Sequence, residues 1–117
     1  MWGLGPAASI FVLSGPLSAQ NALETAVAEI MARYEQCIEN AKERTLLVKK
    51  EALRPKFFAA KVSACDRLRD AEISIAQANA GIAETREQRA ALEAEIAAMT
   101  AALLAGARTE LGLPTSN

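Results

Sequence analysis

The chain has 117 residues, with 13 Lys and Arg side chains against 14 Asp and Glu, and so carries a formal charge of −1. This length fits one small domain, and the near-neutral charge argues against binding to polyanions over the whole surface. Histidine is absent, which excludes Ser-His and Cys-His catalysis, zinc sites with histidine ligands and imidazole pH switches. Alanine contributes 26 residues and aromatic side chains only 4 %, a composition typical of helices rather than of a core filled with bulky side chains.

The N-terminal segment has the character of an export signal. Residues 1–23 contain no charged side chain, and an apolar run at 7–13 is followed by Gly15-Pro16 and then Leu17-Ser18-Ala19. We therefore expect residues 1–19 to be a secretory signal peptide that is cleaved after Ala19, although basic residues are missing from its start. The alternatives are an N-terminus that is not a signal, or an anchor, for which the apolar run is too short. The favoured interpretation predicts a secreted or periplasmic protein with no transmembrane span in the mature chain.

From residue 20 to residue 105 the pattern predicts helix almost throughout. A first helix is expected to begin near residue 22, with Asn21 as its N-cap. Pro55 lacks an amide hydrogen and disfavours helical backbone at Arg54, so the pattern predicts a turn over residues 51–55. The first helix has one stripe of apolar residues spaced by three and four, namely Leu23, Val27, Ile30, Tyr34, Cys37, Ala41 and Val48.

The second helical stretch, from about Lys56 to Ala105, has a longer heptad pattern that includes Leu68, Ala71, Ile75, Ala78, Ile82, Thr85, Arg89, Leu92, Ile96, Met99 and Leu103. The leading prediction for the fold is an all-α antiparallel helical hairpin whose longer second helix continues through Gly81 and forms a coiled coil. The part of that helix beyond its partner would then self-associate through a predicted oligomer seam of Ile82, Leu92, Ile96, Met99 and Leu103. The alternative is a three-helix bundle that breaks at Gly81, with Thr85 and Gln88 as the next capping box. Residues 106–117 are expected to be a flexible tail.

The two cysteines, Cys37 and Cys65, lie at nearly equal distances from the predicted turn. In an antiparallel hairpin they would face each other, so we predict an intramolecular disulfide between them. The alternatives are two buried free thiols or an intermolecular disulfide.

Basic residues gather at the predicted turn. Residues 42–61 include seven Lys and Arg against two Asp and Glu, whereas residues 70–117 include three against seven. Lys49, Lys50, Arg54 and Lys56, with Phe57 and Phe58 beside them, are therefore candidates for contact with an anionic lipid or another anionic envelope component. The simpler interpretation is a turn that lysine and arginine keep soluble.

The sequence contains no phosphate-binding loop, no metal-ligand motif and no nucleophile motif, so we expect no catalytic residue, cofactor or metal. Two adjacent aromatic residues are too few to stack nucleic-acid bases, and we expect no nucleic-acid partner. The leading functional hypothesis is an exported, non-catalytic structural, scaffold or adaptor protein of the cell envelope that forms a homo-oligomer through its second helix. The alternative is a binding module, such as a holdase or tether, whose basic turn engages an anionic lipid or envelope component or another envelope protein.

Overall fold

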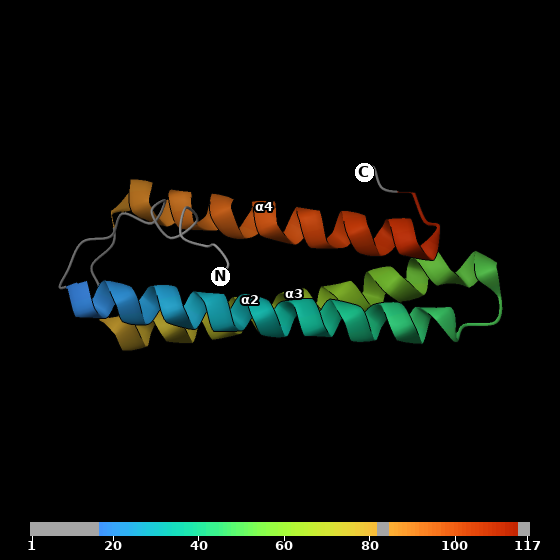
Figure 1. Ribbon diagram of the computed structural model, residues 1–117, viewed down its shortest axis with the longest axis horizontal. Coiled ribbons are helices and arrows are strands. Elements are labelled where there is room, and N and C mark those ends of the chain that lie inside the picture. The colour runs from blue at the N-terminus through green and yellow to red at the C-terminus, as the bar shows by residue number, and fades with distance from the viewer. Residues whose placement is uncertain (1–16, 82–84, 115–117) are drawn as a thin grey trace.

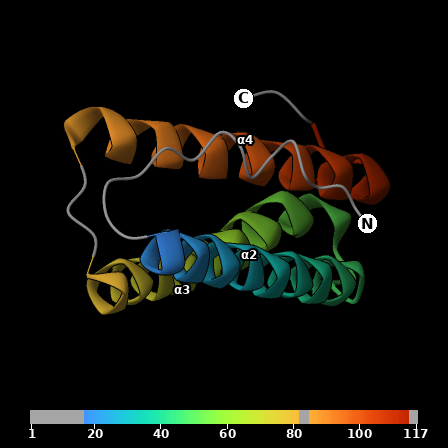
Figure 2. The ribbon, with the colours of Figure 1, turned by 60° about the vertical axis from the view of Figure 1, so that its left-hand side comes forward.

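The computed structural model describes residues 17–81 and 85–114. Within them the chain forms three long helices, α2 (Leu17–Leu46), α3 (Arg54–Ala80) and α4 (Arg86–Leu111), together with a short 3-10 helix, η1 (Glu51–Leu53). α2 and α3 form an antiparallel hairpin, and α4 returns along it to complete a rod of 52 × 25 × 24 Å (Figures 1 and 2). The predicted all-α fold with a helical hairpin is confirmed.

The second half of the hairpin ends at Gly81. This residue has φ +64° at the C-cap of α3, and α4 begins after Thr85. The Thr85 hydroxyl accepts from the Gln88 amide at 3.1 Å, and the Gln88 side chain accepts from the Thr85 amide at 2.9 Å. A left-handed glycine cap and a reciprocal capping box are strong stop and start signals for helices. The leading prediction of one helix through Gly81 is therefore wrong, and the three-helix alternative is correct.

The connection between α2 and α3 spans residues 47–53 and overlaps the predicted turn at 51–55. Arg54 has helical backbone, at φ −62° and ψ −43°, so the expectation that Pro55 excludes helix there is wrong. Pro55 occupies the first turn of α3, where a missing amide hydrogen costs nothing. Before it, the amides of Leu47 and Val48 bond to the carbonyls of Arg44 and Thr45, which closes the last turn of α2. We call residues 46–56 the hairpin tip.

The outer ends of the first and last helices differ from the sequence prediction. α2 already includes Leu17, so Asn21 is not its N-cap, and the predicted cleavage point after Ala19 lies in its first turn. The rest of the predicted signal lies outside the described residues. α4 continues to Leu111 and is capped by Gly112 at φ +72°, so the helix does not end at residue 105. Gly106 lies inside this helix. A glycine there lowers helix stability by only about 1 kcal/mol, and burial of the next residue, Ala107, helps to offset that loss.

α2 is the central helix, because it packs against both of the others. Five residues of the predicted stripe are buried, namely Leu23, Val27, Ile30, Tyr34 and Ala41. The other two, Cys37 and Val48, are only partly buried, and Val48 lies beyond the end of α2. Contact with a second neighbour widens the buried face, which also includes Met31, Ile38 and Thr45. The Thr45 hydroxyl is satisfied by donating to the Ala41 carbonyl at 2.7 Å. The other helices supply the rest of the core, namely Phe58, Val62 and Cys65 from α3 and Leu92, Ile96 and Ala107 from α4.

Candidate functional site

A disulfide joins α2 to α3 within the hairpin. Cys37 and Cys65 are bonded, with their Cα atoms 5.9 Å apart, and 28 positions of sequence separate them. The predicted disulfide is therefore present in this structure. Such a bond is compatible with an oxidising compartment, either extracellular or periplasmic.

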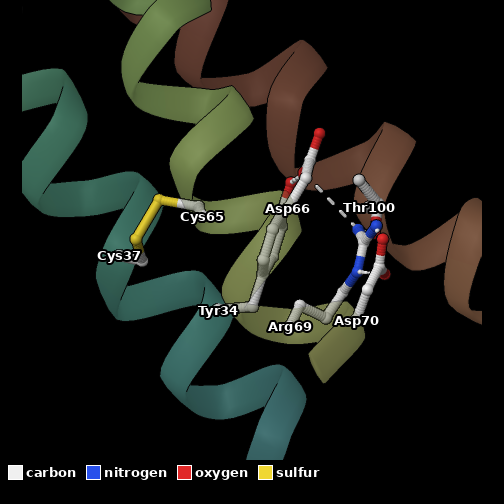
Figure 3. Close-up of polar contacts among 7 residues, drawn as sticks. All are labelled: Tyr34, Cys37, Cys65, Asp66, Arg69, Asp70 and Thr100. Atoms are coloured by element: carbon white, nitrogen blue, oxygen red, sulfur yellow. Dashed lines mark hydrogen bonds and ion pairs between the residues drawn. A yellow bond between two sulfur atoms is a disulfide. The ribbon is translucent and has the colours of Figure 1, made fainter. Parts of the chain in front are cut away.

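A polar network lies beside this disulfide and connects all three helices (Figure 3). Tyr34 of α2 donates its hydroxyl hydrogen to Asp66 of α3 at 2.7 Å. The Arg69 guanidinium lies over the Tyr34 ring, 4.9 Å from its centroid, and donates to Thr100 of α4 at 2.8 Å. Arg69 also pairs with Asp70 at 2.9 Å and with Asp66 at 3.6 Å. One arginine thereby fixes α3 relative to both of its neighbours.

This network was not predicted from the sequence. The position of Arg69 in the sequence does not distinguish it from an exposed arginine on the surface of a helix, yet its side chain is only 13 % exposed. The available signal was Tyr34, because a tyrosine within an apolar stripe needs a partner for its hydroxyl once it is buried. Both carboxylates of the network are paired with the arginine, which points to a structural role in orienting the helices rather than to acid–base chemistry.

Burial and the hydrogen bond to Asp66 raise the pKa of Tyr34 well above its usual value near 10. The phenol of the unfolded chain ionises at the usual value, so its contribution to stability is present below pH 10 and is lost as the pH rises toward the folded pKa. Hydrogen bonds to Glu110 and Glu39 also raise the pKa of Lys42. The α2–α4 ion pair between Lys42 and Glu110 is therefore also lost as the pH rises through this raised pKa.

We expect Tyr34→Phe to reduce this alkaline sensitivity. At pH 7 the variant should be about 1 kcal/mol less stable than the parent, because it lacks the hydrogen bond to Asp66. Above pH 10 the two curves of melting temperature against pH, measured by circular dichroism, should converge. Curves that stay parallel would show that Tyr34 does not contribute to the alkaline transition.

An open groove runs between α3 and α4 next to the network. It encloses about 600 Å³, with charged residues of α3 along one edge and apolar residues of α4 at its base. Leu92 and Ile96 are buried there, while Met99 and Leu103 are partly buried against the same core. Four residues of the predicted oligomer seam thus pack within their own chain, because α4 folds back instead of projecting. The fifth, Ile82, lies outside the described residues.

The four basic residues proposed for the tip do not act alike. Arg54 donates from Nε to the Val48 carbonyl at 2.9 Å and from a terminal nitrogen to the Leu46 carbonyl at 3.2 Å. Its guanidinium therefore caps the C-terminal end of α2, and Arg54 is a structural residue of the turn. Lys49, Lys50 and Lys56 are exposed.

Hydrophobic side chains accompany these lysines, a feature that the sequence analysis did not identify. Leu47 is 77 % exposed, and Leu46 and Leu53 are each about half exposed, at 51 % and 53 %. Of the two phenylalanines, Phe58 is buried in the core, whereas the Phe57 ring lies 5.3 Å from the Lys61 ammonium. The tip therefore combines three exposed leucines with three exposed lysines.

Within the described ranges 17–81 and 85–114, no three Cys, Asp or Glu side chains come together in a way that could hold a metal ion. In the same ranges one helix, α4, is long and apolar enough to cross a bilayer by length and composition. Here it packs as the third helix of the bundle through its buried residues Leu92, Ile96 and Ala107. The expected absence of a transmembrane span stays a prediction.

Among residues 17–81 and 85–114, large apolar side chains are exposed on two surfaces, the hairpin tip and the side of α3 that carries Leu68 and Ile75. Comparison with known proteins adds no family assignment: the chain matches no protein-family model, no curated protein and no solved structure.

Proposed function

We propose that this protein is an exported, non-catalytic tether whose hairpin tip binds an anionic lipid surface. The observation that carries the proposal is the exposure of Leu46, Leu47 and Leu53 among the lysines of the tip. The bundle serves as a rigid stem, with the tip at one end of its 52 Å length (Figure 1).

The tip has both components of interfacial membrane binding. Apolar side chains gain free energy when they leave water for the boundary between headgroups and acyl chains. Lysine near an anionic surface contributes about 1 kcal/mol per residue. Leu47 is 77 % exposed, so its side chain gains little free energy from burial within the described residues. The combination favours the interpretation that the tip binds a lipid surface over the interpretation that its lysines only keep the turn soluble.

Export is supported by two independent features. Residues 1–19 resemble a secretory signal in their order of apolar and small residues, and the Cys37–Cys65 disulfide suits an oxidising compartment. We therefore place the protein in the periplasm or outside the cell, where a lipid headgroup surface is accessible.

Vesicle co-sedimentation tests the tip. The oxidised chain is mixed, at a concentration where light scattering gives a monomer, with phosphatidylcholine vesicles that contain or lack phosphatidylglycerol. Binding is expected only to the anionic vesicles. Lys49→Ala/Lys50→Ala should weaken it about 10- to 30-fold through lost electrostatic attraction, and Leu47→Ser/Leu53→Ser about 10-fold or more through lost apolar insertion.

Matched controls separate the tip from the rest of the surface. Arg86→Glu changes the net charge by the same amount as the double lysine variant, at an exposed position on α4. Leu68→Ser removes a leucine that is 55 % exposed, close to the 53 % of Leu53. Neither control should reduce binding. Equal binding to neutral and anionic vesicles, or equal losses in the tip and control variants, would refute the tether.

A further inference from the structure

α3 has a second apolar face, on its solvent side. Leu68 and Ile75 are 55 % and 60 % exposed, and the alanines between and around them are exposed as well. We call this set the outer stripe of α3, and its members are Ala64, Leu68, Ala71, Ile75 and Ala78. Their spacing alternates between four and three residues, which is the spacing of a coiled-coil seam.

The outer stripe is distinct from the core face of the same helix. The core face consists of Phe58, Val62 and Cys65, with Arg69 in the polar network. A helix on the surface of a soluble bundle normally has polar residues on its outer side. The apolar surface also continues past Ile75 into a groove of about 320 Å³ between α2 and α3, lined in part by Ala22, Ala26, Ile30 and Ala76.

The charges beside the stripe indicate what covers it. Arg67 flanks one side and Glu72 the other, five residues apart. Arg67 donates to the Ser63 hydroxyl at 3.0 Å and forms no ion pair within the described residues. Glu72 forms an ion pair with Arg33 at 3.4 Å, and its side chain is still 27 % exposed.

These charges are self-complementary in one orientation. When two copies of α3 lie parallel and in register, Arg67 of each copy reaches Glu72 of the other, since such flanking positions form the salt bridges between helices of a coiled coil. In an antiparallel pair, Arg67 would instead face Ala60, Ser74 or Arg67 of the second copy, none of which is a carboxylate. The charges thus favour the parallel arrangement.

We infer that two copies of this chain associate in parallel through the outer stripe of α3. The symmetry axis then runs along the rod, so both hairpin tips lie at the same end. Two tips on one surface would bind it with higher avidity than one. The inference goes beyond the proposed function and does not depend on it, because the dimer is tested without lipid.

Sedimentation equilibrium of the oxidised chain tests the contact. We expect the chain to shift from monomer to dimer as its concentration is raised to roughly 200 µM. Leu68→Ser/Ile75→Ser should raise the dissociation constant at least about 100-fold, because each dimer loses four apolar side chains from its interface. Leu53→Ser is the matched control, a leucine of nearly the same exposure at the tip, and should leave the dimer unchanged.

Cysteine cross-linking tests the orientation. Ala78→Cys places a thiol near the end of the stripe, where it meets its counterpart only in a parallel pair. In an antiparallel pair centred between residues 68 and 78 the two thiols would be separated by about 15 Å along the helix axis. Ala59→Cys, an equally small change at an exposed position outside the stripe, is the control. We expect rapid disulfide-linked dimers from Ala78→Cys and few from Ala59→Cys.

Three results would overturn the inference: a chain that stays monomeric, a dimer that survives Leu68→Ser/Ile75→Ser, or cross-linking of Ala78→Cys that is no faster than that of Ala59→Cys. Circular dichroism of each variant establishes that it retains the helical fold. The vesicle assay is done at a concentration where the chain is monomeric, so it reports on the tip alone. Failure of the dimer would change the sedimentation and cross-linking results, whereas failure of the tether would change only the vesicle result.

Discussion

Replacing Leu92 by alanine is expected to destabilise the protein by about 3 kcal/mol, whereas the same change at Leu68 should cost less than about 1 kcal/mol. Both leucines belong to the one apolar pattern that the sequence displays. Leu92 is only 2 % exposed because α4 folds back onto the hairpin, while Leu68 is 55 % exposed on the outside of α3. Urea unfolding, followed by circular dichroism at a concentration where the chain is monomeric, measures the difference.

This pair of variants distinguishes the three-helix bundle from a hairpin with one long second helix. In the long-helix arrangement Leu68 would pack against the first helix and Leu92 would project into solvent. A larger loss from Leu68→Ala than from Leu92→Ala would therefore contradict the fold-back of α4.

Removal of the disulfide is expected to have a similarly large effect. Cys37→Ser/Cys65→Ser should lower the free energy of unfolding by about 3.5 kcal/mol, because the bond restricts a loop of 28 residues in the unfolded chain. For a domain of this size the corresponding fall in melting temperature is roughly 15–25 °C. Thermal unfolding of the oxidised parent and of the double variant gives the value directly.

Reduction of the parent protein provides the control for this prediction. Treatment with a thiol reductant should lower the melting temperature of the parent to nearly that of Cys37→Ser/Cys65→Ser, and should leave the variant unchanged. A double variant that melts with the parent would show that the bond does not restrict the unfolded chain. A shift in the variant on reduction would point to a different effect of the reductant.

Local signals in the sequence determined the first half of the fold. Pro55 marks the turn because proline suits the first turn of a new helix, although Arg54 before it is itself helical. Once the turn is placed, Cys37 and Cys65 face each other across the hairpin, so the disulfide followed from spacing alone. The three- and four-residue periodicity of α2 identified one side of its buried face, but not Met31, Ile38 and Thr45. The basic character of the tip was also evident, because charge is counted directly from the sequence.

Only the tertiary structure decided what happens after Ala80. The heptad pattern continues across Gly81 without a change of phase, so periodicity favours one long helix. The capping box of Thr85 and Gln88 competes with it, and burial of Leu92 and Ile96 in the bundle core favours the break. The same folding places Leu68 and Ile75 outside, because Phe58 and Cys65 direct the other face of α3 toward α2.

The individual roles of the polar residues likewise could not be predicted from the sequence. Arg54 and Arg69 carry the same positive charge as their exposed basic neighbours Lys56 and Arg67. Yet Arg54 caps the end of α2, whereas Arg69 joins three helices. Which basic residue is buried depends on where carbonyls, carboxylates and an aromatic ring meet in space. Composition and periodicity determine which residues are helical and apolar, whereas contacts between distant segments determine which of them are covered and which face solvent.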